Sequence, residues 1–233
     1  MKVQKPMGIL RIVSRSDEPF RDRSEAGEIL SGHLMHFRGS NAVVLGVPRG
    51  GLVVGQAIAR ALEADLDIVL AHKLRTPGHP ELAIGSVSED GRLFLNENLV
   101  RELGVRKEYL EEEKARQMAE NARRIEIVRK TVPKVPLADR TVIVTDDGIA
   151  TGATMQAALW AASQERPERL IAALPVGPED TLVRLSEDAH EIICLRSPLF
   201  FVAIGQFYTR FDQVTDDQVI SILQEERQKT IRQ

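Results

Sequence analysis

The sequence has few cysteines, few aromatic residues and no long apolar run, although it extends over 233 residues. Its one cysteine, Cys194, has no second cysteine for a disulfide within the chain, which is typical of a reducing compartment. No apolar stretch approaches the roughly 20 residues of a transmembrane helix. The segment 7–13 is too short, and too interrupted by Arg11, for a signal peptide. We therefore expect a cytoplasmic protein without a membrane partner.

An excess of charge of either sign is also lacking. Lys and Arg number 31 and Asp and Glu number 34, so the formal net charge is −3. Proteins that bind nucleic-acid phosphates are strongly basic, and this balance disfavours nucleic acid as a partner. Hydrophobic residues make up 43% and charged residues 28%, as in folded globular domains, which argues against intrinsic disorder.

Short apolar runs alternate with helical patterns along most of the chain. Helical apolar spacing separates several of the runs, and strands that alternate with helices imply right-handed crossovers and a parallel sheet. The sequence therefore predicts an α/β fold, an open and mainly parallel sheet with helices on both faces. The expected strands are 41–47, 67–71, 141–145, 170–174 and 191–195, and the expected helices are 52–64, 154–163, 179–189 and 215–228.

Two regions depart from this alternation. Segment 72–95 is rich in Gly, Pro and polar residues, and we expect a flexible loop that contains a hairpin with its turn at 88–91. Segment 96–136 is a charged insertion with a long helix expected at 105–129, whose charged residues would face solvent. A coiled-coil partner for this helix is the less favoured alternative, because its apolar stripe covers too few heptads.

The first residues that indicate chemistry follow the strand 141–145. Asp146 and Asp147 stand at its carboxyl end, where two carboxylates can hold sugar hydroxyls or a hydrated Mg²⁺. The next residues are mostly small or hydroxylated, so backbone N–H groups can turn toward an anion at the start of the following helix. A sugar phosphate with a diol suits this segment; a plain turn, with Thr151 or Thr154 as helix cap, is the alternative. The anion loop consists of Gly148, Ile149, Ala150, Thr151, Gly152, Ala153 and Thr154.

A second loop of similar character follows the strand 41–47. Pro48, Arg49, Gly50 and Gly51 combine a cationic side chain with glycine amides, and such a loop can bind an anion or form a simple tight turn. In an open parallel sheet, ligands bind beyond the carboxyl ends of strands whose connections diverge. If the strands that precede the two loops are neighbours, one ligand can contact both loops.

The segment 142–154 resembles the signature for 5-phosphoribosyl-1-pyrophosphate (PRPP) in type I phosphoribosyltransferases. That signature is an apolar strand, two acidic residues and a Thr-Gly-X-Thr loop. The resemblance covers about residues 20–208 and is closest to phosphoribosyltransferase-like proteins of bacteria and archaea that share both loops. It implies one phosphoribosyltransferase-like domain over 1–233. The implied reaction is transfer of the phosphoribosyl group to a nitrogen acceptor, expected to be a nucleobase in nucleotide metabolism, with release of pyrophosphate.

The resemblance also implies roles for the two loops. Residues 148–154 would hold the 5′-phosphate, while Asp146 and Asp147 would engage the ribose and Mg²⁺. Residues 48–51 would bind the pyrophosphate, and in the family this loop often contains a cis peptide. Lys73 and Arg75 would reach the pyrophosphate from a third side, unless they are solvated loop charges.

Two further segments acquire roles from the same resemblance. The loop through Glu81 takes the position of a flexible loop that closes over PRPP and excludes water, so Glu81 would stabilise the cationic transition state or contact the acceptor. Segment 196–212 takes the position of the hood that covers the acceptor. Its aromatic residues Phe200, Phe201 and Tyr208 are candidates to stack on the acceptor, core packing being the alternative. The resemblance leaves room for a homodimer.

Two other functions stay open at this point. A non-catalytic regulatory module could keep the PRPP site and act on a protein partner or on RNA, with Arg123, Arg124, Arg129 and Lys130 as a basic surface. A flavodoxin-like or nicotinamide-dependent oxidoreductase fits the fold, but the sequence lacks the phosphate-binding fingerprint of that class.

Overall fold

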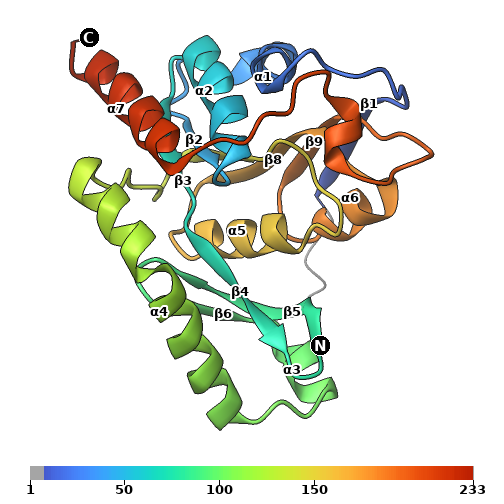
Figure 1. The fold of residues 1–233 in the computed structure, drawn as a ribbon, viewed down its shortest axis with the longest axis vertical. Coiled ribbons are helices and arrows are strands. Elements are labelled where there is room, and N and C mark those ends of the chain that lie inside the picture. Colours follow the sequence, from blue (N-terminus) through green and yellow to red (C-terminus); the bar gives the residue numbers. More distant parts are fainter. Residues whose placement is uncertain (1–7, 233) are drawn as a thin grey trace.

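The computed structural model describes residues 8–232, without the side chains of 79–81, 121, 123, 124 and 230–232. Its main sheet has six parallel strands in the order β1-β9-β8-β7-β2-β3 (Figure 1). These strands are β1 (Ile9–Ser14), β2 (Val43–Gly46), β3 (Asp65–Ile68), β7 (Thr141–Thr145), β8 (Arg169–Val176) and β9 (Glu191–Arg196).

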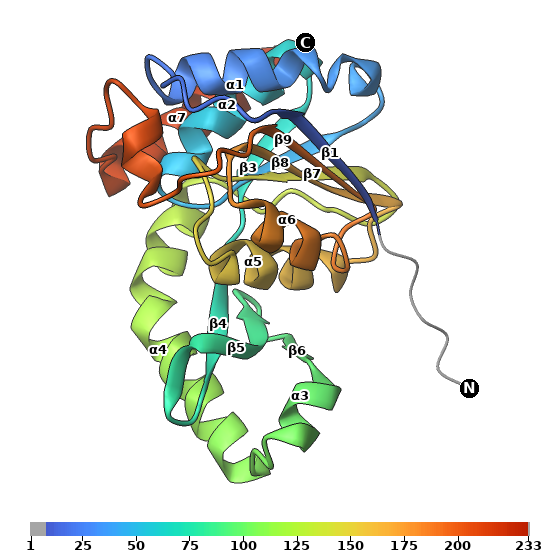
Figure 2. The same cartoon turned by 90° about the vertical axis from the view of Figure 1, so that its right-hand side faces the viewer.

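Helices cover both faces of the main sheet (Figure 2). One face carries α1 (Arg23–Gly32), α2 (Gly50–Leu62) and α7 (Asp216–Arg232), and the other carries α5 (Ala153–Ser163) and α6 (Glu179–Leu185). Each layer of helices buries its own hydrophobic cluster against the strands. The α/β class expected from the sequence is therefore confirmed.

The topology brings the carboxyl ends of β2 and β7 together. The two strands are paired in parallel, with Gly46 opposite Thr145 at the end of the ladder. From β2 the chain crosses through α2 to β3 on one side, whereas from β7 it crosses through α5 to β8 on the other. The connections diverge between these two strands, which is the position where open α/β sheets bind ligands.

Strand β1 was not expected from the sequence. It is an edge strand whose side chains alternate between exposed and half-buried, with Leu10 and Ile12 packed against the core and Ile9 66% exposed. Its partner β9 lies far away in the sequence, so the pairing leaves no local signal beyond a short apolar stretch.

A second, antiparallel sheet lies beyond α5 with the order β4-β5-β6 (Figure 2). Its elements are β4 (Ala71–Thr76), β5 (His79–Ser88) and β6 (Leu93–Leu95), followed by α3 (Glu97–Glu102) and α4 (Lys107–Thr131). The expected hairpin is confirmed, with Gly91 in the left-handed region at φ +78°. The expected strand 67–71 is wrong, because the buried link at Val69 and Leu70 divides it between two sheets.

Helix α4 does not place all of its charged residues in solvent. Glu113 is 3% exposed, and its uncharged neighbour on the helix, Gln117, is 4% exposed. The Glu113 carboxylate accepts hydrogen bonds from the Arg75 backbone N–H (3.2 Å) and from Gln117 Nε2 (3.0 Å). Strand β4 is the edge of its sheet, so a carboxylate on α4 satisfies a backbone donor that would otherwise lack a partner.

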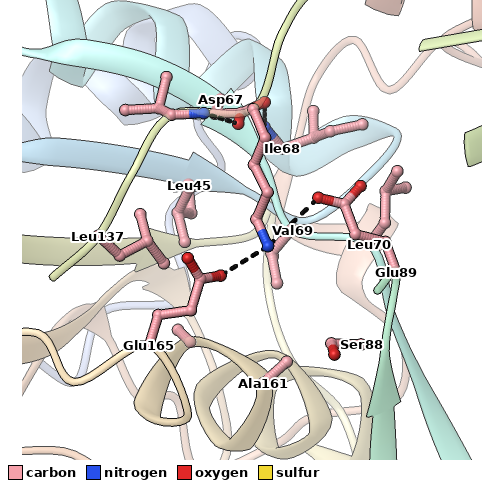
Figure 3. Close-up of a pocket in the computed structure, with 13 residues that line it drawn as sticks. Leu45, Asp67, Ile68, Val69, Leu70, Ser88, Glu89, Leu137, Ala161 and Glu165 are labelled. Carbon is pink, nitrogen blue, oxygen red and sulfur yellow. Dashed lines mark hydrogen bonds and ion pairs between the residues drawn. The ribbon is translucent and has the colours of Figure 1, made fainter. Parts of the chain in front are cut away.

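The end of α4 joins the two sheets through a buried charge network. A cavity of about 20 Å³ beside it is lined by Asp67, Glu89, Lys134 and Glu165 (Figure 3). Arg129 Nη1 donates to Asp67 Oδ1 (2.8 Å), and its Nε donates to Glu89 (2.7 Å). Lys134 pairs with Glu165 at 2.7 Å. Burial raises the pKa of Asp67, although Arg129 opposes this shift. Arg129 therefore does not lie on the expected basic surface; the side chains of Arg123 and Arg124 are outside the described residues.

Among residues 8–232, no helix combines the length and the apolar composition needed to cross a membrane.

We expect Cys194 to be unreactive in the folded protein. The side chain is buried in β9, its Sγ lies 3.2 Å from the Arg196 carbonyl, and burial raises the pKa of its thiol to about 12. Since the thiolate is the nucleophile, a disulfide reagent at pH 8 should label the chain only after unfolding in urea. Rapid stoichiometric labelling of the native protein would contradict this expectation.

Candidate functional site

The loop 48–51 packs directly against the two acids that precede the anion loop. A Cβ on Gly50 would lie 1.9 Å from Oδ2 of Asp147, and a Cβ on Gly51 would lie 2.7 Å from Cα of Asp146. The loop 48–51 can therefore pack this closely on the acids only because it has glycine at both positions. The peptide bond between Pro48 and Arg49 is cis.

The two acids differ in their surroundings. Asp146 accepts the backbone N–H of Asp147 on Oδ1 (2.8 Å), and burial together with the neighbouring Asp147 charge raises the pKa of Asp146 well above its usual range. Asp147 is 13% exposed, and its Oδ2 lies 2.7 Å from Nε of Arg23. Asp147 is thus the carboxylate that is paired with a cation.

The anion loop presents a row of backbone donors. Ile149 N–H bonds to the Val176 carbonyl (2.9 Å), and Gln156 N–H bonds to the Gly152 carbonyl (2.8 Å). Between them, the N–H groups of 150–155 have no acceptor within the described part of the chain. Gly152 is the N-cap of α5, in the left-handed region and without a side-chain cap, so the alternative in which Thr151 or Thr154 caps the helix is wrong. The arrangement suits an anion.

The predicted cations are divided between two places. Arg49 precedes α2, is 36% exposed and lies 4.0 Å from Asp216 in the first turn of α7. Lys73 and Arg75 are on β4 rather than on a loop beyond the main sheet, and the Arg75 carbonyl accepts a hydrogen bond from Tyr109 (2.9 Å). Their role at the pyrophosphate stays a prediction, and their alternative as loop charges is wrong in that both residues belong to a strand.

Glu81 belongs to β5, and its side chain lies outside the described residues.

The hood candidates have three different environments. Tyr208 is 6% exposed, lies 5.5 Å from the Phe20 ring and 5.0 Å from the Phe211 ring, and donates its hydroxyl to the Asp147 carbonyl (2.6 Å). Burial raises the pKa of this hydroxyl. Tyr208 therefore follows the alternative of core packing rather than stacking on an acceptor, and its hydroxyl contacts the Asp147 backbone. Phe200 is 84% exposed, and Phe201 packs on Phe207 at 5.2 Å.

A cleft of about 580 Å³ lies between the anion loop, α6 and the start of the hood. Its lining is amphipathic and combines apolar side chains of the hood with two arginines and two acids. Arg15 pairs with Glu179, and Arg184 pairs with Asp180. The lining consists of Arg15, Ala150, Thr151, Pro178, Glu179, Asp180, Thr181, Arg184, Ser197, Pro198, Leu199 and Phe201.

The donor set limits what metal the site could hold. In the described part of the chain, no three His, Cys, Asp or Glu residues group in a way that could hold a metal ion. Asp146 and Asp147 supply two carboxylates, and Mg²⁺ is commonly bound by one or two carboxylates together with substrate phosphates and water. These residues therefore fit a Mg²⁺ that enters with a phosphorylated ligand, not a permanently bound ion.

Arg23 is not among the site residues that the sequence predicts. An Asp three residues before a Glu, as in Asp22 and Glu25, is a sequence signal for the start of a helix. In the structure the Asp22 side chain accepts a hydrogen bond from the Glu25 N–H (3.0 Å) at the start of α1. The contact of Arg23 with Asp147 spans 124 positions, and no local pattern predicts it.

Comparisons with known proteins agree with this geometry. The family model described as "Phosphoribosyl transferase domain" matches residues 23–211. "Putative phosphoribosyl transferase MT0597" of Mycobacterium tuberculosis is 39% identical over 204 residues, which are 88% of this chain and 46% of that protein. This chain thus spans about half the length of the curated relatives that it matches.

A solved structure supports the fold at higher similarity. The crystal structure of TT1426 from Thermus thermophilus superposes with a TM-score of 0.85 at 42% identity, covering 89% of this chain and 98% of that one. The match to the family model includes both loops, the acids and Arg23. On these grounds the chain belongs to the phosphoribosyltransferase family.

Proposed function

We propose that the protein transfers the 5-phosphoribosyl group of PRPP to a nitrogen acceptor and releases pyrophosphate. The observation that supports this most is the position of Asp146 and Asp147 between two anion-binding loops. On one side are the amides of 150–155, and on the other are Arg49 and the glycines that contact the acids. PRPP carries a phosphate, a diol and a pyrophosphate in this order, and the arrangement has one partner for each.

Each part of the site then has a task. The amides of 150–155, with the Thr151 and Thr154 hydroxyls, bind the 5′-phosphate, and the Asp146 and Asp147 carboxylates accept hydrogen bonds from the ribose hydroxyls. Arg49 and the amides of residues 50–51 stabilise the charge of the departing pyrophosphate. Mg²⁺, when bound with PRPP, supplies further positive charge to the leaving group.

The cleft beside Thr151 is the proposed acceptor site. Displacement at the anomeric carbon requires the nucleophile and the leaving group on opposite sides of that carbon. The pyrophosphate loop follows β2, whereas the cleft is lined from the loops after β8 and β9, and β7 with its acids lies between them in the sheet. Phe201 offers an aromatic surface in this cleft, consistent with a nucleobase.

Calorimetric titration with PRPP, with and without Mg²⁺, tests the proposal. We expect saturable binding that is tighter with Mg²⁺, followed by pyrophosphate release when purines, pyrimidines or other amines are added. Binding without pyrophosphate release for any acceptor would favour a non-catalytic PRPP-binding module. Absence of binding under every condition would overturn the proposed function.

A further inference from the structure

Arg23 lies against three parts of the site, namely the acids, the pyrophosphate loop and the hood. It is the first residue of α1, and its side chain is 11% exposed. Nε lies 2.7 Å from Asp147 Oδ2, and Nη1 donates to the Asp212 carbonyl at 2.8 Å. A Cβ on Gly50 would lie 2.7 Å from the same Nε. Arg23 thus lies where the acids, the pyrophosphate loop and the hood meet.

Several contacts fix the orientation of this guanidinium. Its Cζ lies 3.9 Å from the centre of the Phe211 ring, so the plane is held by the aromatic face while two nitrogens bind oxygens. The hydroxyl of Tyr208 binds the Asp147 carbonyl from the same hood segment. The position of Asp147 is therefore set through both its side chain and its backbone.

The charge of Arg23 matters for the ligand as well as for the acid. Adjacent carboxylates at a site for a polyanion repel that ligand, and the repulsion is strong where water is largely excluded. Arg23 is in direct contact with one of these carboxylates and offsets its charge. The contact uses Oδ2 of Asp147, so it constrains the direction of the other carboxylate oxygen.

We propose that Arg23 is a positioning residue, which aims the Asp147 carboxylate at the ribose hydroxyls and offsets its charge against the pyrophosphate of PRPP. The proposal rests on the proposed function. It differs from a structural role, in which Arg23 would only tie α1 to the hood and would affect stability alone.

The experiment measures PRPP affinity by calorimetry at fixed Mg²⁺ for the wild type and for Arg23→Gln, Arg23→Lys and Arg21→Gln. Arg21 is the matched control: its side chain is 56% exposed, lies two residues away and pairs with Asp22 instead of Asp147. Unfolding midpoints are recorded for all four proteins. Arg23→Ala is titrated with and without guanidinium chloride far below denaturing concentrations, with equal sodium chloride as the salt control.

We expect Arg23→Gln to weaken PRPP binding by about tenfold or more, the effect of removing one partner of a largely buried charge pair. Arg23→Lys should lose less, because it keeps the charge but lacks the planar fork, and Arg21→Gln should bind as the wild type does. Guanidinium ion should restore part of the affinity of Arg23→Ala, which a purely structural role would not allow. If Arg23→Gln does not fold, the comparison of Arg23→Lys with the wild type decides.

Two results would count against the proposal, and they are distinct. PRPP affinities of Arg23→Gln and Arg23→Lys equal to that of the wild type would overturn the role of Arg23 and leave the proposed function intact. A wild type that does not bind PRPP would overturn the proposed function and, with it, the role of Arg23.

Discussion

The double variant Asp146→Asn/Asp147→Asn is expected to lose PRPP binding while it keeps its fold. Each carboxylate that accepts a hydrogen bond from a ligand contributes about 1.5–3 kcal/mol, so loss of both weakens binding by about a hundredfold or more. Two effects on stability oppose each other. A neutral side chain at 146 relieves the burial and the like charge that raise the pKa of Asp146, whereas the change at 147 removes the partner of Arg23.

Calorimetry with PRPP and Mg²⁺ measures the loss of PRPP affinity, and circular dichroism with thermal unfolding measures whether the fold and its stability are kept. Glu111→Gln/Glu112→Gln is a suitable control, since it removes the same charge from two adjacent exposed acids on α4. The control should bind PRPP as the wild type does. Unchanged PRPP affinity in the Asp146/Asp147 variant, with the fold intact, would show that these acids do not engage the ligand.

The main sheet was predictable because its central strands are buried on both faces. Strand β7 is buried at all five positions, and its expected bounds, 141–145, are those observed. The meeting of loop 48–51 with the acids after β7 was also predictable, since parallel strands with diverging connections place their loops at one edge. Sequence order and general rules of topology were sufficient for this part of the site.

The rest of the site depends on contacts that have no local signal. Arg23 meets Asp147 across the fold, and Tyr208 turns inward because Phe20 and Phe211 pack on its ring. The division of the expected strand 67–71 has a different origin. The link between β3 and β4 is apolar because it is buried between two sheets, and by composition alone it continues the strand before it.

The buried network at the end of α4 leads to the second large prediction. Arg129→Met should destabilise the protein by about 3 kcal/mol, because it leaves the buried carboxylates of Asp67 and Glu89 without their shared cation. Lys130→Met is the matched control. The neighbouring Lys130 forms an exposed pair with Glu126, and such pairs contribute about 0.3–0.5 kcal/mol. Urea unfolding of both variants measures the difference.

The loss of folding stability caused by Arg129→Met should also depend on pH. Burial raises the folded-state pKa of Asp67 above its ordinary value, so between the two pKa values the native state binds more protons and stability falls as pH rises. Loss of Arg129 raises the folded-state pKa of Asp67 further. The pH range over which stability falls with rising pH then extends toward neutral pH. The deficit should therefore be largest near about pH 7.5 and shrink toward about pH 5.

The groups next to Arg129 provide a test of whether the charge left on Asp67 causes the loss of stability. Lys134 and Glu165 form the next pair of the network, and Lys134 also lies 3.5 Å from Glu89, so Glu89 keeps one cation in the variant. Within the described part of the chain, Asp67 keeps its bonds from the backbone N–H groups of Ile68 and Val135. The added change Asp67→Asn should thus restore part of the stability at pH 7.5 and remove the pH dependence. A deficit that is equal at both pH values would locate the loss in packing around Arg129 rather than in the charge left on Asp67.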